Sequence, residues 1–261
     1  MIVGALAIVL LASCGRGGMA SRVPRAPGVD SAGVQATRAD SVDSAARSTA
    51  GGGGRPQTPT PNSQTRLMVF LGTSLTAGLG LDPDEAYPAL IQRRLAGRRP
   101  PWQAVNAGVS GETSAGALRR LDAVLRGPVA ILVVETGAND GLRGLELDST
   151  RANLEAIVRR ARANRPGIGI VLAGMEVPPN LGPRYAARFR ALFRDLAARE
   201  GLPLIPFLLE GVGGVDSLNQ PDGIHPNAAG ARIVADNVWK VLAPLVARES
   251  AAAPGGAPGP R

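Results

Sequence analysis

The sequence predicts an α/β fold in which a five-stranded parallel sheet lies between two layers of helices. Two observations lead to this prediction. Between residues 67 and 247, five short apolar runs alternate with five amphipathic stretches, and this alternation is typical of βαβ units. The chain has 261 residues, of which 44% are hydrophobic, so it can bury a substantial core. We therefore predict a three-layer α/β/α sandwich.

The five apolar runs are the candidate strands, at residues 67–71, 103–106, 130–135, 167–173 and 203–207. Most of them are nearly continuous in apolar residues, as expected of strands that helices cover on both faces. In a sheet of this kind, functional sites form beyond the carboxyl ends of the strands. The residues that directly follow each run therefore decide what the site can do.

Each candidate strand is followed by a segment with helical periodicity, at residues 84–95, 114–125, 150–163, 183–199 and 227–246. In these segments apolar residues recur every three or four positions, which places them on one face of a helix. A helix that crosses over between two strands allows those strands to run parallel. The five pairs together therefore predict an all-parallel sheet.

The first 14 residues predict an export signal. Residues 1–13 are mostly apolar and shorter than the roughly 20 residues that a membrane-spanning helix needs. The tetrapeptide Leu-Ala-Ser-Cys that ends at Cys14 resembles a bacterial lipobox, which predicts a lipoprotein anchored through Cys14 and facing the periplasm or the cell exterior. Because no Lys or Arg precedes the apolar run, an ordinary secreted protein and a chain without a signal stay open as alternatives.

Two further segments are predicted to be disordered. Residues 15–66 are rich in Gly, Ser, Ala, Pro and Thr without any periodicity, and residues 248–261 are similar. Such segments bury too little apolar surface to offset the loss of chain entropy. The predicted organisation is an export signal (1–14), a linker, one folded domain (67–247) and a tail.

Composition excludes several kinds of site. With one Cys and one His in the chain, neither a disulfide framework nor a zinc site with two His or several Cys ligands can form. Only carboxylate and carbonyl metal sites are chemically open, and we predict no metal. Any mechanism that needs an imidazole must use His225.

The formal net charge of +8 does not indicate a nucleic-acid partner. Residues 67–247 contribute only +3 of it, whereas the linker contributes +4 and the tail +1. Aromatic residues make up 3% of the chain, and no basic run is interleaved with them. A stacking platform for bases is therefore not expected, and we predict no nucleic-acid binding.

A serine follows the first candidate strand, in the segment Gly72-Thr73-Ser74. A serine on the turn from a buried strand to a helix can expose its hydroxyl group, and the backbone N–H groups of such a turn can bind an anion. Ser74 is therefore a candidate nucleophile. The alternative is an ordinary turn, because Ser, Thr and Gly are common in turns.

The single histidine lies in the segment Asp222-Gly-Ile-His225-Pro-Asn. An aspartate three residues before a histidine can reach the ring's Nδ1–H within the turn and thereby leave Nε2 free as a base. His225 and Asp222 are thus candidates for a catalytic pair. A surface or capping histidine near a helix start is the alternative.

Two further loops follow the second and third candidate strands. The first contains Gly108 and Gly111, and small residues there let a backbone N–H approach a substrate. The second contains Asn139 between two glycines, and its amide is a candidate oxyanion donor. Ordinary turn chemistry is the alternative for both loops.

Taken together and in this order, the segments GTSLTAG, NAGVSGET, GANDGLRG and DGIHPN resemble the four sequence blocks of the SGNH, or GDSL-type, hydrolases. The similarity is strongest to the bacterial arylesterase, thioesterase I and lysophospholipase branch, and it spans residues 67–247. The resemblance implies a flavodoxin-like fold and hydrolysis of small-molecule esters or thioesters by a monomer without a cofactor.

The resemblance also implies the roles of individual residues. Ser74 corresponds to the nucleophile, His225 to the base and Asp222 to its orienting acid. The oxyanion hole would consist of the Ser74 N–H, the Gly111 N–H and the Asn139 side chain. Gly111 fits better than Gly108, because it occupies the glycine of the family's S-G-[DE]-T segment.

The sequence departs from the family pattern at one position, because Thr73 replaces the aspartate of the usual Gly-Asp-Ser block. We expect activity to survive this change, although it puts the rigidity of the nucleophile turn in doubt. Two other functions stay open, a carbohydrate O-acetyl esterase and a non-catalytic envelope binding module. Four residues after the third and fourth strands are candidates for an acyl groove or for core packing: Leu142, Val177, Pro178 and Leu181.

Overall fold

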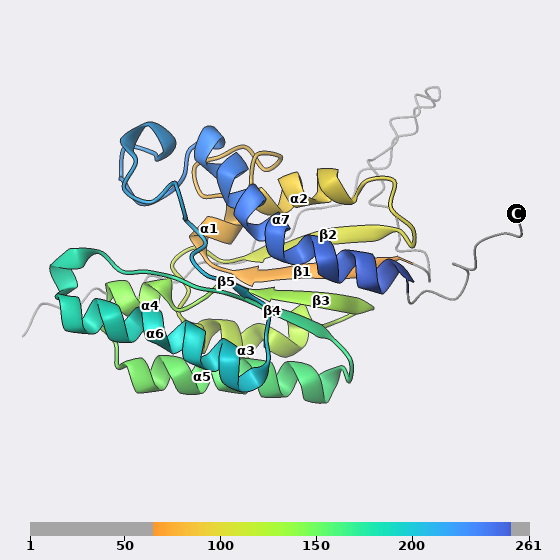
Figure 1. The fold of residues 1–261 in the computed structure, drawn as a ribbon, viewed down its shortest axis with the longest axis horizontal. Coiled ribbons are helices and arrows are strands. Elements are labelled where there is room, and N and C mark those ends of the chain that lie inside the picture. Colours follow the sequence, from red (N-terminus) through yellow and green to blue (C-terminus); the bar gives the residue numbers. More distant parts are fainter. Residues whose placement is uncertain (1–64, 252–261) are drawn as a thin grey trace, which may run out of the picture. The chain divides into compact units, whose positions relative to one another are not determined.

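The computed structural model describes residues 65–251 and confirms the predicted fold. Five strands form one sheet in the order β2-β1-β3-β4-β5, and all neighbouring strands run parallel. The helices lie on both faces of this sheet (Figure 1). The strands are β1 (Arg66–Gly72), β2 (Trp102–Gly108), β3 (Val129–Val134), β4 (Gly169–Ala173) and β5 (Leu204–Ile205).

Two strands are shorter than predicted because of glycine and proline. Strand β4 begins two residues later than the apolar run, since Gly167 has a φ of 87°, a conformation outside the extended region. Strand β5 has only two residues, and it lies between Pro203 and Pro206. A proline has no N–H group to donate to a neighbouring strand, so the pairing stops early.

The helices form two layers. Helices α2 and α7 cover one face of the sheet, whereas α3, α5 and α6 cover the other (Figure 1). Strands buried on both faces must be apolar throughout, which explains the continuous apolar runs in the sequence. The bounds are α2 (Tyr87–Leu95), α3 (Ser114–Val124), α5 (Leu147–Asn164), α6 (Pro183–Glu200) and α7 (Ala228–Ala251).

Four short helical segments lie in the loops at the carboxyl ends of the strands, and the sequence analysis did not predict them. Helix α1 directly follows β1, and α4 follows β3, so both stand at the edge where the polar candidate residues gather. The segments are α1 (Ser74–Ala77), α4 (Ala138–Leu142), η1 (Pro179–Leu181) and η2 (Asp216–Leu218).

Both predicted ends of the domain shift by a few residues. Strand β1 begins at Arg66, which the sequence analysis placed in the linker, and helix α7 continues to Ala251, inside the predicted tail. A salt bridge between Arg66 and Glu249 joins these two ends, so the extra residues belong to the fold.

The predicted signal, its Cys14 and the rest of the linker and tail lie outside the described residues. Within residues 65–251, none of the helices is both long enough and apolar enough to cross a membrane.

Candidate active site

The turn that carries Ser74 requires two glycines. Strand β1 ends at Gly72, where an added Cβ would lie only 1.9 Å from the Thr76 side chain. At Gly108, which ends β2, an added Cβ would lie 2.2 Å from the backbone nitrogen of Ala77. Since real Cβ atoms do not approach this closely, only glycine lets α1 pack against these strand ends. Ser74 is therefore the first residue of α1, at the carboxyl edge of the sheet.

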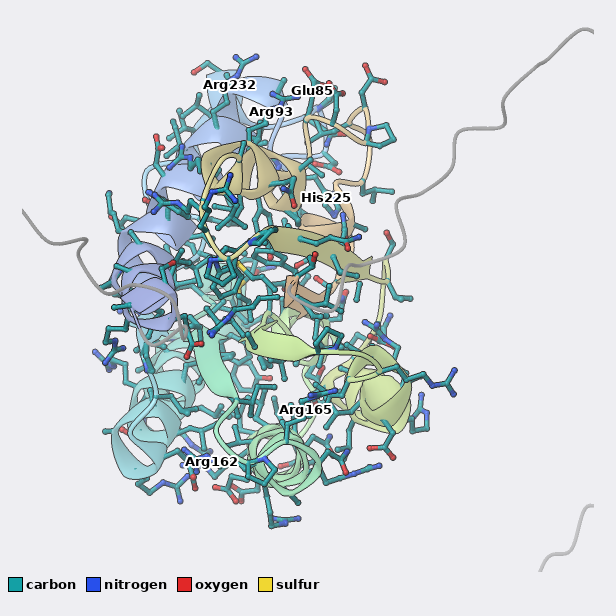
Figure 2. The ribbon with its side chains drawn as sticks, turned by 90° about the vertical axis from the view of Figure 1, so that its right-hand side faces the viewer. Glu85, Arg93, Arg162, Arg165, His225 and Arg232 are labelled. Carbon is teal, nitrogen blue, oxygen red and sulfur yellow. The ribbon has the colours of Figure 1, made fainter. Side chains whose placement is uncertain are left out.

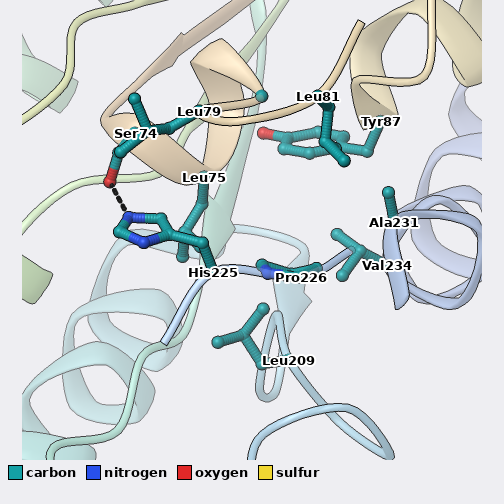
Figure 3. A pocket seen from close by; sticks show the side chains of 11 residues that line it. Ser74, Leu75, Leu79, Leu81, Tyr87, Leu209, His225, Pro226, Ala231 and Val234 are labelled. Carbon is teal, nitrogen blue, oxygen red and sulfur yellow. Dashed lines mark hydrogen bonds between the residues drawn. The ribbon is translucent and has the colours of Figure 1, made fainter. Parts of the chain in front are cut away.

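Ser74, His225 and Asp222 lie in one line of hydrogen bonds. The distance between Ser74 Oγ and His225 Nε2 is 2.8 Å, and Figure 3 shows this contact. On the other side of the ring, His225 Nδ1 lies 2.6 Å from Asp222 Oδ2. The structure thus brings together three residues that the sequence analysis selected from opposite ends of the domain.

Backbone hydrogen bonds fix the charge of Asp222. Its Oδ1 accepts hydrogen bonds from the backbone N–H groups of His225 at 3.0 Å and of Ile224 at 2.9 Å. The bonds from the backbone and side chain of His225, followed by the bond from Ile224, lower the pKa of Asp222 from 3.8 to about 2. The carboxylate therefore stays ionised under all ordinary conditions and can stabilise a positive charge on the ring.

The loop that carries His225 is held from both sides. The Gln220 N–H donates to the His225 carbonyl at 2.7 Å, and the Gln220 side-chain amide donates to the Leu79 carbonyl at 2.6 Å. This second bond joins the His225 loop to the segment that follows Ser74. On the far side, Asn227 accepts hydrogen bonds from the N–H groups of Ala229 and Gly230 and thereby caps helix α7.

The candidate oxyanion donors belong to loops that are bonded to each other. The Asn139 side-chain amide donates one N–H to the Glu112 carbonyl at 3.0 Å, which leaves its second N–H for another acceptor. Arg143 donates to the Gly111 carbonyl at 2.9 Å, and Gly111 has a φ of 76°. Within the described part of the chain, the N–H groups of Ser74 and Gly111 have no acceptor.

An ion pair joins the Gly111 loop to the nucleophile strand. The Arg120 guanidinium contacts both carboxylate oxygens of Glu112, at 2.6 to 2.9 Å, and also donates to the Gly72 carbonyl at 3.1 Å. Glu112 directly follows Gly111, and Gly72 lies two residues before Ser74. Arg120 therefore links the Gly111 loop to the turn that carries Ser74. Sequence reasoning missed this role of Arg120, since Glu112 precedes helix α3 and lies 8 residues from Arg120, beyond the three or four residues that separate ion pairs within a helix.

Thr73, the departure from the family pattern, bonds to a buried carboxylate beneath the nucleophile. The Thr73 N–H and hydroxyl donate to Glu135 at 2.8 to 3.1 Å, and the Thr76 hydroxyl donates to Glu135 at 2.8 Å. Thr76 is in turn hydrogen-bonded to Tyr87 at 2.7 Å. Thr73 and Glu135 are almost completely buried. The turn that carries Ser74 is thus tied to the end of β3.

Burial raises the pKa of Glu135, and the hydrogen bonds from Thr73 and Thr76 oppose this shift. Burial also raises the pKa of Tyr87, with a further contribution from the charge of Glu135. Sequence reasoning missed Glu135, although a signal was present: it is the only charged residue at the end of an otherwise apolar strand. A charged side chain at such a position is rarely buried without partners.

We expect Glu135→Ala to lower the free energy of unfolding by about 3 kcal/mol, because it leaves three buried donors on Thr73 and Thr76 without an acceptor. Urea unfolding followed by circular dichroism measures this loss. Glu135→Gln keeps one carbonyl acceptor and should lose less. Equal stability of Glu135→Ala and the wild type would contradict the role of this carboxylate.

An apolar hollow adjoins the Ser74–His225 pair. Its internal volume is about 10 Å³, room for about one water molecule, and the side chains of Leu75, Tyr87 and Leu209 contribute to its wall (Figure 3). None of the four residues proposed for an acyl groove lines it. Val177 instead packs close to Gly141, where an added Cβ would lie 2.5 Å from its side chain, and Leu142 is exposed.

Comparison with known proteins identifies the family. The model of the GDSL-like Lipase/Acylhydrolase family matches residues 70–233. The chain is 43% identical over 188 residues to the esterase TesA of Pseudomonas aeruginosa, which covers 72% of this chain and 92% of that protein. It is 37% identical over 189 residues to the thioesterase 1/protease 1/lysophospholipase L1 of Escherichia coli, with coverage of 70% and 86%.

The fold agrees with this comparison. The crystal structure of TesA superimposes with a TM-score of 0.65 and 45% sequence identity, and it covers 70% of this chain and 99% of that one. The resemblance that the four sequence blocks predicted is therefore confirmed. Since the family model spans most of the folded domain and the relatives match along most of their own length, the chain belongs to the GDSL-like lipase/acylhydrolase family and is an ester hydrolase.

Proposed function

We propose that the protein hydrolyses carboxylic esters and thioesters through an acyl-enzyme formed on Ser74. The observation that carries this proposal is the contact of 2.8 Å between Ser74 Oγ and His225 Nε2, with Asp222 on the other ring nitrogen. A serine hydroxyl is a weak nucleophile unless an adjacent base takes its proton. His225 is the base, and Asp222 holds the tautomer that leaves Nε2 free to accept the proton.

In the first step, Ser74 Oγ attacks the acyl carbon while its proton passes to His225 Nε2. The ionised Asp222 stabilises the imidazolium that forms. The tetrahedral intermediate then collapses, and the imidazolium gives its proton to the departing alcohol or thiol. In the second step a water molecule attacks the acyl-enzyme, with His225 again as the base, and releases the acid and free Ser74.

The negative charge on the acyl oxygen develops next to three N–H donors, the backbone groups of Ser74 and Gly111 and the side chain of Asn139. Donors that are already oriented before the reaction lose little energy to reorganisation when the charge appears. The bond from Asn139 to the Glu112 carbonyl and the bond from Arg143 to the Gly111 carbonyl provide this orientation.

We expect Asn139→Ala to lower kcat by about 10²-fold to 10³-fold with little change in KM, because the lost donor acts mainly in the transition state. Steady-state hydrolysis of p-nitrophenyl butyrate measures both constants. Asn164→Ala is the matched control, since Asn164 ends helix α5 and bonds to Asp122. A kcat that stays within about twofold of the wild type would exclude Asn139 from the oxyanion hole.

The proposed substrates are aryl esters, acyl thioesters and lysophospholipid-like esters. The relatives support this class, because their names describe an esterase and a thioesterase/lysophospholipase, and a further relative, 31% identical over 176 residues, is an arylesterase of Vibrio mimicus. Apolar side chains line the hollow beside Ser74, which favours an apolar acyl group. The carbohydrate O-acetyl esterase alternative lacks an aromatic platform, since Trp102 is buried and Arg94 and Arg98 approach the ring of Trp239.

A panel of p-nitrophenyl esters and acyl-CoA thioesters of graded chain length tests this proposal. We expect turnover of short and medium acyl chains that disappears in a folded Ser74→Ala variant. Absence of turnover on every ester and thioester, with retained binding, would instead support the binding module that the sequence analysis left open.

We also propose that residues 1–14 direct export and that Cys14 is lipidated, so that the enzyme is anchored to a membrane facing the periplasm or the cell exterior. The support is the Leu-Ala-Ser-Cys sequence. Mass spectrometry of the mature N-terminus tests it. A diacylated Cys14 is the expected result, and a terminus that retains Met1 would contradict processing.

A further inference from the structure

The acidic residues of the folded domain are concentrated at the edge that carries Ser74, whereas its basic residues lie mostly elsewhere. We define the catalytic edge as the segments that run from the strand ends through the first turn of each following helix. They are residues 73–90, 109–117, 135–150, 174–186 and 206–231. This edge holds 12 of the 17 acidic residues between positions 67 and 247, but only two of the 20 basic ones. The net charge of +3 is therefore the sum of a negatively charged edge and a positively charged remainder of the domain.

Ion pairs neutralise only part of this excess. Within the described chain, Arg93, Arg120 and Arg190 form salt bridges with acids of the catalytic edge. Figure 2 shows Glu85 near Arg93 and Arg232, with which it lines a hollow.

Two of the remaining acids of the catalytic edge are buried and one is the catalytic Asp222. Six carboxylates are then left that form no salt bridge within the described residues, against two arginines, Arg143 and Arg184. Glu85 is half-buried, and the other five are exposed. They are Asp82, Glu146, Asp148, Glu210 and Asp216.

The same edge also holds the exposed apolar side chains. All six large hydrophobic residues that are exposed in the described chain lie in these segments, and none lies on the opposite edge of the sheet. They are Leu79, Val109, Leu142, Leu145, Val215 and Ile224. The opposite edge carries Arg98, Arg99, Arg126 and Arg165 in its loops. A substrate that approaches Ser74 therefore meets apolar side chains together with negative charge.

We propose that this charge distribution selects the leaving group, so that the enzyme prefers acyl esters whose alcohol or thiol is neutral or positively charged. The inference rests on the proposed function, since it concerns the substrate of the same site. Ser74 lies on the catalytic edge, so the leaving group of a substrate bound there lies on the same edge as the exposed carboxylates. An anionic leaving group is repelled there, and a cationic one is attracted.

The effect acts over a distance and is therefore sensitive to salt. The Debye length falls from roughly 30 Å at 0.01 M salt to about 3 Å at 1 M. Surface carboxylates around a site act mainly on the rate of association, and so on kcat/KM rather than on kcat. The sign of the salt dependence therefore reports the sign of the field that the substrate meets.

Three butyrate esters with differently charged para substituents on the phenol test the proposal, each through its own salt dependence. They are the esters of 4-nitrophenol, 4-hydroxybenzenesulfonate and 4-(trimethylammonio)phenol, which are neutral, anionic and cationic. Their kcat/KM values are measured from about 0.01 M to about 1 M sodium chloride. We expect kcat/KM to rise about twofold or more for the anionic ester, to fall by a similar factor for the cationic ester and to change little for the neutral one.

A pair of double variants assigns the effect to the catalytic edge. Asp82→Asn with Asp216→Asn removes two of its exposed charges without touching the catalytic residues, and should reduce both salt slopes while leaving the neutral ester unchanged. The matched control, Asp195→Asn with Asp236→Asn, removes the same charge from helices α6 and α7 and should keep both slopes.

The outcomes separate the two proposals. Turnover of the neutral ester with salt slopes that are flat, or alike for the anionic and cationic esters, overturns the selection of the leaving group and leaves the proposed function intact. The proposal is also overturned if both double variants change the salt dependence of kcat/KM equally, because the electric field would then come from the whole surface. No turnover of any of the three esters contradicts the proposed function itself, and with it this inference.

Discussion

Replacement of Ser74 by alanine is expected to lower kcat for p-nitrophenyl butyrate by about 10⁴-fold or more, since no other group can form the acyl-enzyme. Ser74 Oγ is the atom that contacts His225 Nε2, and the alanine side chain removes it without adding volume. The fold should not change, because the Ser74 hydroxyl is partly exposed and takes no part in the Thr73–Glu135 hydrogen bonds.

The control for this experiment is Ser149→Ala, which removes a hydroxyl from an exposed position on helix α5. Its kcat should equal that of the wild type, and circular dichroism should show both variants folded. Phenylmethylsulfonyl fluoride gives a second readout, since it should modify Ser74 in the wild type and no serine in Ser74→Ala. Modification of another serine, with loss of activity, would show that this other serine is the nucleophile.

Asp222→Asn is expected to lower kcat by about 10⁴-fold while the protein stays folded. The asparagine oxygen can still accept the N–H groups of Ile224 and His225. Its NH₂ group, however, would face His225 Nδ1 and favour the tautomer in which Nε2 already carries a proton. That tautomer cannot accept the proton of Ser74.

The pH dependence follows from the same pair. Because the pKa of Asp222 is lowered to about 2, its carboxylate is the ionised partner throughout the measurable range. The acid side of the kcat/KM profile should therefore show no second proton from Asp222. Stopped-assay profiles down to about pH 4 measure this. A dependence on two protons on the acid side would contradict the ionised state of Asp222. For the Asp222→Asn variant, activity near the wild-type level would show that Asp222 has no part in the mechanism.

The three-layer fold and the candidate catalytic residues could be predicted from the sequence because they depend on local patterns. The five apolar runs differ from the amphipathic segments in period, and a single histidine leaves one choice of base. Ser74 and His225 lie at the carboxyl edge simply because they follow strand positions of a parallel sheet.

The remaining features depend on contacts between distant segments, which no local pattern records. The apolar hollow joins Leu75 to Leu209 and Val234, and the support of the nucleophile turn joins Thr73 to Glu135. The four residues considered for an acyl groove lie outside this hollow, since proximity to a strand end does not say which way a side chain packs. Likewise, Glu249 near the end of α7 forms a salt bridge with Arg66 of β1, and neither segment alone indicates this pairing.

The contact between Ser74 and His225 spans 151 positions of the sequence, and this separation links activity to completion of the chain. The nucleophile lies at the end of the first strand, whereas its base precedes the last helix. A chain that has been synthesised only as far as β5 has a serine but no imidazole, because His225 is the only one. The protein therefore cannot act on acyl groups while it is being made, and hydrolysis begins only when the C-terminal segment docks onto the sheet.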